Sequence, residues 1–222
     1  MSGSLDETMQ LPPRNWFDRW WVPAEFFDLV CNHNDSVQQD EFFNNPKLKP
    51  LREAYAAAYF AAIRAQSKPC LLRLVAGEFP DFELSIGEDV LKFELTEADR
   101  AGRRRGQEYR EAAAREVAEL APETELFDPG EEERAALRAI ERALELKARK
   151  HYRPPPHLLV YVNFFTFQKS PLTGLEWAGL AKPWHDRFAS IWLLWGAKVV
   201  RCWPNPAMIV AREEPSAVLG SN

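Results

Sequence analysis

Two acidic residues, Asp81 and Glu94, lie thirteen positions apart in a stretch that alternates apolar and polar residues. Pro80 precedes the first acid, and Leu95 and Thr96 follow the second. Carboxylate oxygens are the ligands that Mg²⁺ and Mn²⁺ prefer, and two carboxylates on adjacent strands can share one such ion. We therefore expect a divalent metal site at Asp81 and Glu94.

Three consecutive arginines, Arg103, Arg104 and Arg105, come directly after this stretch, between Gly102 and Gly106. A helix is expected from about residue 107 to 120, and arginines near a helix N-terminus oppose its dipole. Guanidinium groups bind phosphate well. We expect these arginines to contact the phosphate backbone of a nucleic acid, although a solvated loop with three spare arginines is the alternative.

Composition limits the class of protein. The chain has 222 residues, a net charge of −5 and 46% hydrophobic residues, which is typical of a globular domain rather than of a basic nucleic-acid coat. Any attraction to phosphate must therefore be local. No apolar run reaches the roughly 18 residues of a membrane span, the N-terminus is polar, and the three cysteines are far apart, so a cytoplasmic location is expected.

The periodicity of apolar residues predicts an ordered series of elements. A helix is expected over 50–66, three strands over 70–75, 79–86 and 90–96, helices over 107–120 and 128–150, a central strand over 157–167, a helix over 173–188, and a hairpin of 191–195 with 198–203. The three consecutive strands predict an antiparallel meander, and no element is expected after Pro204. The fold class is α+β (α/β), with a mixed central sheet flanked by helices.

Four regions are expected along the chain: a disordered N-terminus over 1–14, an aromatic cap over 15–49, a main domain over 50–211 and a loose tail over 212–222. The cap is rich in tryptophan and phenylalanine. We expect it to pack on the core, and the alternative is a surface that binds a protein partner or stacks on bases.

The order helix-strand-strand-strand-helix-strand over 50–167 resembles the core of the PD-(D/E)XK nuclease superfamily, which has the restriction-endonuclease-like fold. The motif residues of the resemblance are Pro80-Asp81 and Glu94-Leu95-Thr96. The final helix and hairpin would be additions at the edge of the sheet. The resemblance implies a DNA nuclease in which Asp81 and Glu94 hold one or two Mg²⁺ ions, and Glu53 matches a position where some members place another acid.

The chain departs from the family pattern at one position. The family places a lysine two residues after the second acid, whereas this chain has Thr96, which carries no charge to stabilise a developing anion. Lys92 lies on the same strand face as Glu94, but it precedes this acid by two residues instead of following it. Either Lys92 or the arginine cluster would have to supply the positive charge.

Two other functions remain open from the sequence. The missing lysine and the net acidity are compatible with a catalytically degenerate nuclease fold that binds protein or nucleic acid. An unrelated enzyme acting on a phosphorylated small molecule ranks last, because the chain has no glycine-rich phosphate loop of the usual spacing.

Overall fold

The computed structural model describes residues 12–37, 41–42, 45–100, 102, 107–108, 111, 114, 129–164 and 174–210. Four expectations lie outside these ranges: the arginine cluster 103–105, nearly all of the helix 107–120, the loose tail 212–222 and most of the N-terminal segment 1–14. They remain predictions.

A seven-stranded mixed sheet forms the centre of the molecule, and its strands lie side by side in the order in which they occur in the sequence. They are β1 (Leu71–Leu74), β2 (Phe82–Ile86), β3 (Asp89–Ala98), β4 (His157–Val162), β5 (Ser190–Trp195), β6 (Lys198–Trp203) and β7 (Ala207–Val210). Strands β1 to β3 form the predicted antiparallel meander, β4 and β5 run parallel to β3, and β6 and β7 are antiparallel again. The α+β class and the mixed sheet are therefore confirmed.

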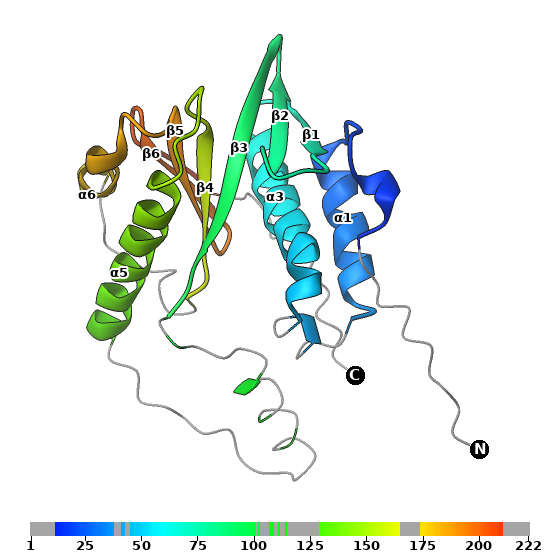
Figure 1. Ribbon diagram of the computed structural model, residues 1–222, viewed down its shortest axis with the longest axis horizontal. Helices are drawn as coiled ribbons and strands as arrows, with labels where there is room; N and C mark the ends of the chain where they lie inside the picture. The colour runs from blue at the N-terminus through cyan, green and yellow to red at the C-terminus, as the bar shows by residue number, and fades with distance from the viewer. Residues whose placement is uncertain are drawn as a thin grey trace.

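Helices cover both faces of this sheet (Figure 1). One face carries α1 (Pro23–Asn34) and α3 (Lys49–Ala65), and the other carries α5 (Pro129–Ala148) and α6 (Gly174–Ala181). The short 3-10 helices η1 (Arg14–Trp16), η2 (Pro46–Leu48) and η4 (Lys182–Trp184) connect these elements. Strands β3, β4 and β5 step in one direction across the sheet, so right-handed crossovers bring α5 and α6 to the same face.

The helices divide the buried residues into two clusters, one on each side of the sheet. Strand β4 contributes to both, because Leu159 joins the cluster under α1 and α3 while Leu158 and Val160 join the cluster under α5. Side chains of a strand alternate between faces, so an apolar strand covered on both sides is a central one. The prediction that this segment is central is confirmed.

The aromatic N-terminal segment packs into the same core as α3. Trp16 and Phe27 are buried in the cluster under α1 and α3, and the backbone of Phe17 and Trp21 pairs with Leu74 and Leu72 at the outer edge of β1. This pairing covers the exposed edge of a sheet, which would otherwise invite association with other chains. The prediction that this segment packs on the core is confirmed, and Trp16, at 2% exposure, is not part of the surface.

Two expectations about the C-terminal part were wrong. The chain does not lose its pattern after Pro204, because Ala207–Val210 pairs with β6 as an added edge strand. The helix expected to reach Phe188 ends at Ala181, where a 3-10 turn with Pro183 in its first residues takes over. Proline lacks the N–H that an α-helix needs there, which explains the early end.

Candidate metal and phosphate site

Asp81 and Glu94 lie opposite each other on the sheet face that α5 covers. Their neighbours Phe82 and Phe93 are paired in register and stack at 4.8 Å on the other face, where both rings pack under α3. Because side chains alternate along a strand, burying this phenylalanine pair turns the adjacent acids toward α5. The geometric expectation that both acids share one face is confirmed, while their roles remain predictions.

The site lies where β2 begins, at the point where β3 extends past it. Asp81 is the last residue before β2, and its Oδ2 accepts a hydrogen bond of 2.6 Å from the backbone N–H of Leu95. That N–H lies one residue beyond Glu94, where β3 has no further partner on the β2 side. The Asp81 carboxylate thus accepts the Leu95 N–H bond that a backbone carbonyl of a neighbouring strand would otherwise accept. This bond holds the Asp81 carboxylate beside Glu94.

A lysine from α5 bridges the two acids. Lys147 Nζ lies 2.7 Å from Glu94 Oε2 and 3.7 Å from Asp81 Oδ2. Its side chain is 16% exposed and that of Glu94 only 2%, so this is a largely buried ion pair. By sequence, Lys147 is one of three basic residues near the C-terminus of the helix, where positive charge complements the helix dipole. Nothing in its local sequence separates it from Arg149 and Lys150, because only the packing of α5 on β3 shows which side chain reaches the sheet.

Tyr152, also not anticipated, completes the arrangement from the segment after α5. Its hydroxyl donates a hydrogen bond of 2.6 Å to Glu94 Oε2, and its ring stacks on Phe79 at 5.3 Å, just before Asp81. Burial and the Glu94 hydrogen bond raise the pKa of the Tyr152 hydroxyl, so it stays a neutral donor. Tyr152 therefore connects Glu94 to the segment that carries Asp81.

Asp81 has an unusual protonation equilibrium. Burial raises its pKa from 3.8 to about 6, although the Lys147 ammonium and the Leu95 N–H act in the opposite direction. The charges of Glu94 and Glu53 contribute to the rise. Acids with a raised pKa and a specific cationic neighbour concentrate at functional sites.

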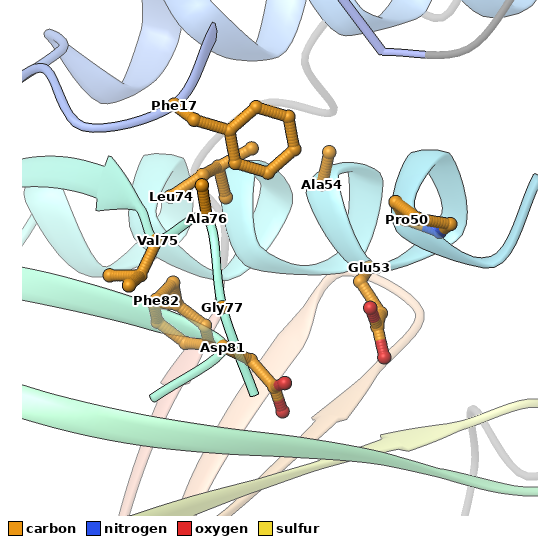
Figure 2. Close-up of a pocket in the computed structure, with 10 residues that line it drawn as sticks. All are labelled: Phe17, Pro50, Glu53, Ala54, Leu74, Val75, Ala76, Gly77, Asp81 and Phe82. Carbon is orange, nitrogen blue, oxygen red and sulfur yellow. The ribbon is translucent and has the colours of Figure 1, made fainter. Parts of the chain in front are cut away.

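Glu53 lies near Asp81 but belongs to a different set of contacts. It is on α3, where it forms an ion pair of 2.9 Å with Lys49. Both Glu53 and Asp81 line a pocket of about 270 Å³ whose apolar side includes Phe17, and Figure 2 shows the two carboxylates on the same side of it. Glu53 thus contributes negative charge beside the site without contacting Lys147 in the described structure.

The other predicted residues of β3 lie further away. Thr96 is half-buried two residues beyond Glu94, beside Val160 of β4. Lys92 is exposed and lies opposite Glu83, whose carboxylate binds Arg73. Lys92 and Glu94 are about 7 Å apart along the strand, so the cation closest to the acids is Lys147 and not Lys92.

The donor set suits a divalent cation in part. Glu94 Oε1 is buried without a hydrogen-bond partner among the described residues, which leaves one carboxylate oxygen unsatisfied. A carboxylate oxygen of this kind is a suitable ligand for Mg²⁺ or Mn²⁺, and the Asp81 carboxylate is close enough to share Lys147 with Glu94. Within the described ranges, however, no group of three or more metal-ligating side chains is present.

Comparisons with other proteins leave the family open. No protein-family model, curated protein or solved structure matches the chain. In the described part of the chain, no helix has the length and apolar character that a membrane span requires.

Proposed function

We propose that this chain is a metal-dependent nuclease of the PD-(D/E)XK type that hydrolyses phosphodiester bonds of DNA. The observation that carries the proposal is the contact of Lys147 with both Asp81 and Glu94. The family motif needs two acids and one ammonium group in contact, and here the ammonium comes from α5 in place of the third-strand lysine. The charge that Thr96 cannot supply is therefore supplied by Lys147, which is 53 positions beyond Glu94 in the chain.

The order of elements supports the same proposal. Helix α3 is followed by the meander β1–β2–β3, then by α5 and the parallel strand β4, which is the helix-strand-strand-strand-helix-strand order of the superfamily core. Strands β5 to β7 and α6 would extend this core at one edge.

The residues of the site have separable roles in this mechanism. A divalent ion held by Asp81 and Glu94 would polarise the phosphate and lower the pKa of the attacking water. Lys147 stabilises negative charge that develops on the phosphate oxygens, an interaction that is strong because the ammonium is largely buried. Tyr152 and the Leu95 N–H orient the two carboxylates.

The direct test is cleavage of plasmid or single-stranded DNA in Mg²⁺ or Mn²⁺. We expect Asp81→Asn and Glu94→Gln each to lower the rate at least about 100-fold, because each loses a ligand of the ion. Asp89→Asn, at the exposed first residue of β3, makes the same chemical change away from the site and serves as the control. Cleavage that survives the double Asp81→Asn, Glu94→Gln change would refute the proposal.

A second candidate function is a degenerate nuclease fold that only binds. It is favoured by the absence of a three-ligand cluster in the described ranges and by the ion pair that already neutralises Glu94. Of the three tryptophans in the described N-terminal segment, Trp16 is buried, whereas Trp20 and Trp21 are partly exposed under Arg73 and Arg19 and could serve in docking. Calorimetry that detects no Mn²⁺ binding, together with no cleavage, would select this alternative.

A further inference from the structure

A second pocket, of about 390 Å³, lies at the C-terminal end of α5. It is lined by Glu145, Ala148, Arg149, His151, Trp184 and Arg187. Its volume falls within the range of about 300–1,000 Å³ that is typical of ligand pockets. The pocket does not include Asp81, Glu94 or Lys147, so it is distinct from the site described above.

Positive charge is concentrated around this pocket. Segments 145–153 and 182–187 contain six basic residues and two acidic ones, Glu145 and Asp186, in a chain whose net charge is −5; the six are Lys147, Arg149, Lys150, Arg153, Lys182 and Arg187. The side chains of Arg149 and Arg187 are 68% and 43% exposed. An anion approaching this end of α5 therefore meets two accessible guanidinium groups.

The contacts inside the pocket arrange these groups for a phosphate. Arg187 donates a hydrogen bond of 3.0 Å to His151 Nδ1, which orients its guanidinium, and its Nε lies 3.9 Å from Asp186 Oδ2. Arg149 is held by Glu145 at 2.6 Å. Guanidinium groups fixed in this way lose less conformational entropy when they bind a phosphate.

An aromatic ring completes the pocket. Trp184 is half-buried at the end of η4, so part of its ring is accessible from the pocket. A tryptophan face beside arginines is the combination with which proteins bind single-stranded nucleic acid: the base stacks on the ring and the guanidinium groups hold the backbone.

One short segment of the chain contributes residues both to this pocket and to the proposed catalytic site. Lys147 and Tyr152 contact Glu94, whereas Arg149 and His151 of the same segment line the pocket. Lys147 and Arg149 are two residues apart, so their Cα atoms are separated by about 7 Å at most. A strand bound at one place is therefore within reach of the other.

We propose that this pocket binds one nucleotide of a single-stranded DNA segment, with its base on Trp184 and its phosphates on Arg149 and Arg187. The proposal rests on the proposed nuclease function for the identity of its ligand. It places a backbone-binding surface at α5 and η4, separate from the arginine cluster 103–105.

The experiment is fluorescence anisotropy of the full-length protein with a labelled, mixed-sequence single-stranded DNA of about 16 nucleotides, near the upper end of known site sizes. EDTA is present, so that no cleavage occurs. For Arg149→Ala with Arg187→Ala we expect affinity about tenfold lower or more, and a slope of log K against log salt smaller by about 1.4, at roughly 0.7 per lost phosphate contact. Trp184→Leu should weaken binding about fivefold or more at unchanged slope, because a ring makes no ionic contact.

The matched control is Arg138→Ala with Arg142→Ala, which removes the same charge from exposed positions on α5 that do not line the pocket. Equal losses for the two double variants would overturn the proposal, because the effect would then be net charge alone. Competition by a polyglutamate peptide as strong as that by unlabelled DNA would overturn it too, in favour of an acidic protein segment. Circular dichroism checks that each variant is folded.

The outcomes separate this inference from the nuclease proposal. DNA binding that depends on Arg149, Arg187 and Trp184 without any cleavage in Mg²⁺ would support the pocket and refute the nuclease. Cleavage that depends on Asp81, together with normal DNA binding by the pocket variants, would support the nuclease and refute the pocket.

Discussion

Lys147 Nζ lies 2.7 Å from Glu94 Oε2, although the two residues are 53 positions apart in the sequence. Glu94 is 1% exposed and accepts bonds from Lys147 and Tyr152 through one oxygen only. A buried carboxylate needs such partners, because its desolvation would otherwise favour the protonated form. The lysine therefore has a structural role in stabilising Glu94 and, in the proposed mechanism, a chemical role as well.

The first prediction concerns Lys147→Met. It should lower DNA cleavage about 100-fold or more, because the charge beside the phosphate is lost. It should also lower the free energy of unfolding by about 3 kcal/mol, because Glu94 is left buried without its counter-ion. Mn²⁺ binding, measured by calorimetry, should be retained or become tighter, because the ammonium no longer competes for the same carboxylate oxygens.

The exposed Lys47→Met is the control for loss of one positive charge. Lys92→Met tests the other lysine that the sequence suggested. If Lys92→Met lowers the cleavage rate and Lys147→Met does not, the catalytic ammonium group has been assigned to the wrong lysine.

The second prediction is a pH dependence of metal binding. The pKa of Asp81 is raised to about 6, so below that value a proton increasingly occupies the carboxylate that should bind the ion. Mn²⁺ affinity should therefore fall by about tenfold per pH unit below pH 6 and level off above it. Calorimetry between pH 5 and pH 8 measures this, and a flat profile would contradict the assignment of Asp81 as a ligand.

The third prediction concerns stability at the same residue. The folded pKa lies above the unfolded value of 3.8, so Asp81 favours the folded state below pH 3.8 and this contribution is lost as the pH rises through about 6. The stability of Asp81→Asn relative to the native chain should therefore increase between pH 4 and pH 7, by about 3 kcal/mol at most. Urea unfolding at the two pH values checks this, and the opposite sign would show that Lys147 outweighs burial.

The fourth prediction separates the two contacts of Tyr152. Tyr152→Phe removes the hydrogen bond to Glu94 but keeps the stacking on Phe79, and should cost about 1.5–3 kcal/mol of stability. Tyr152→Leu removes both contacts and should cost more. In cleavage assays, Tyr152→Phe should mainly lower kcat, because the Glu94 carboxylate loses a group that orients it while the contacts to the substrate stay the same. An effect confined to KM would contradict this positioning role.

The sequence predicted most of the elements, because each has a local signal. Pro50 and the apolar spacing after it marked α3, and the alternation from Phe79 to Thr96 marked β2 and β3. The short strand β7 carried too little periodicity to be recognised, since it is an exposed edge strand whose place is set by pairing with β6.

The sequence by itself determined which acids come together: Asp81, directly before one strand, and Glu94, in the next, are turned to one face because Phe82 and Phe93 must be buried on the other. The tertiary structure alone decided which cation meets them. Lys147 could be identified only from the packing of α5 on β3. Lys147 and Glu94 are 53 positions apart in the sequence, and no local sequence pattern predicts a contact between residues so far apart. The pocket of Arg149 and Trp184 has the same origin, since α5 and η4 meet only in the folded chain.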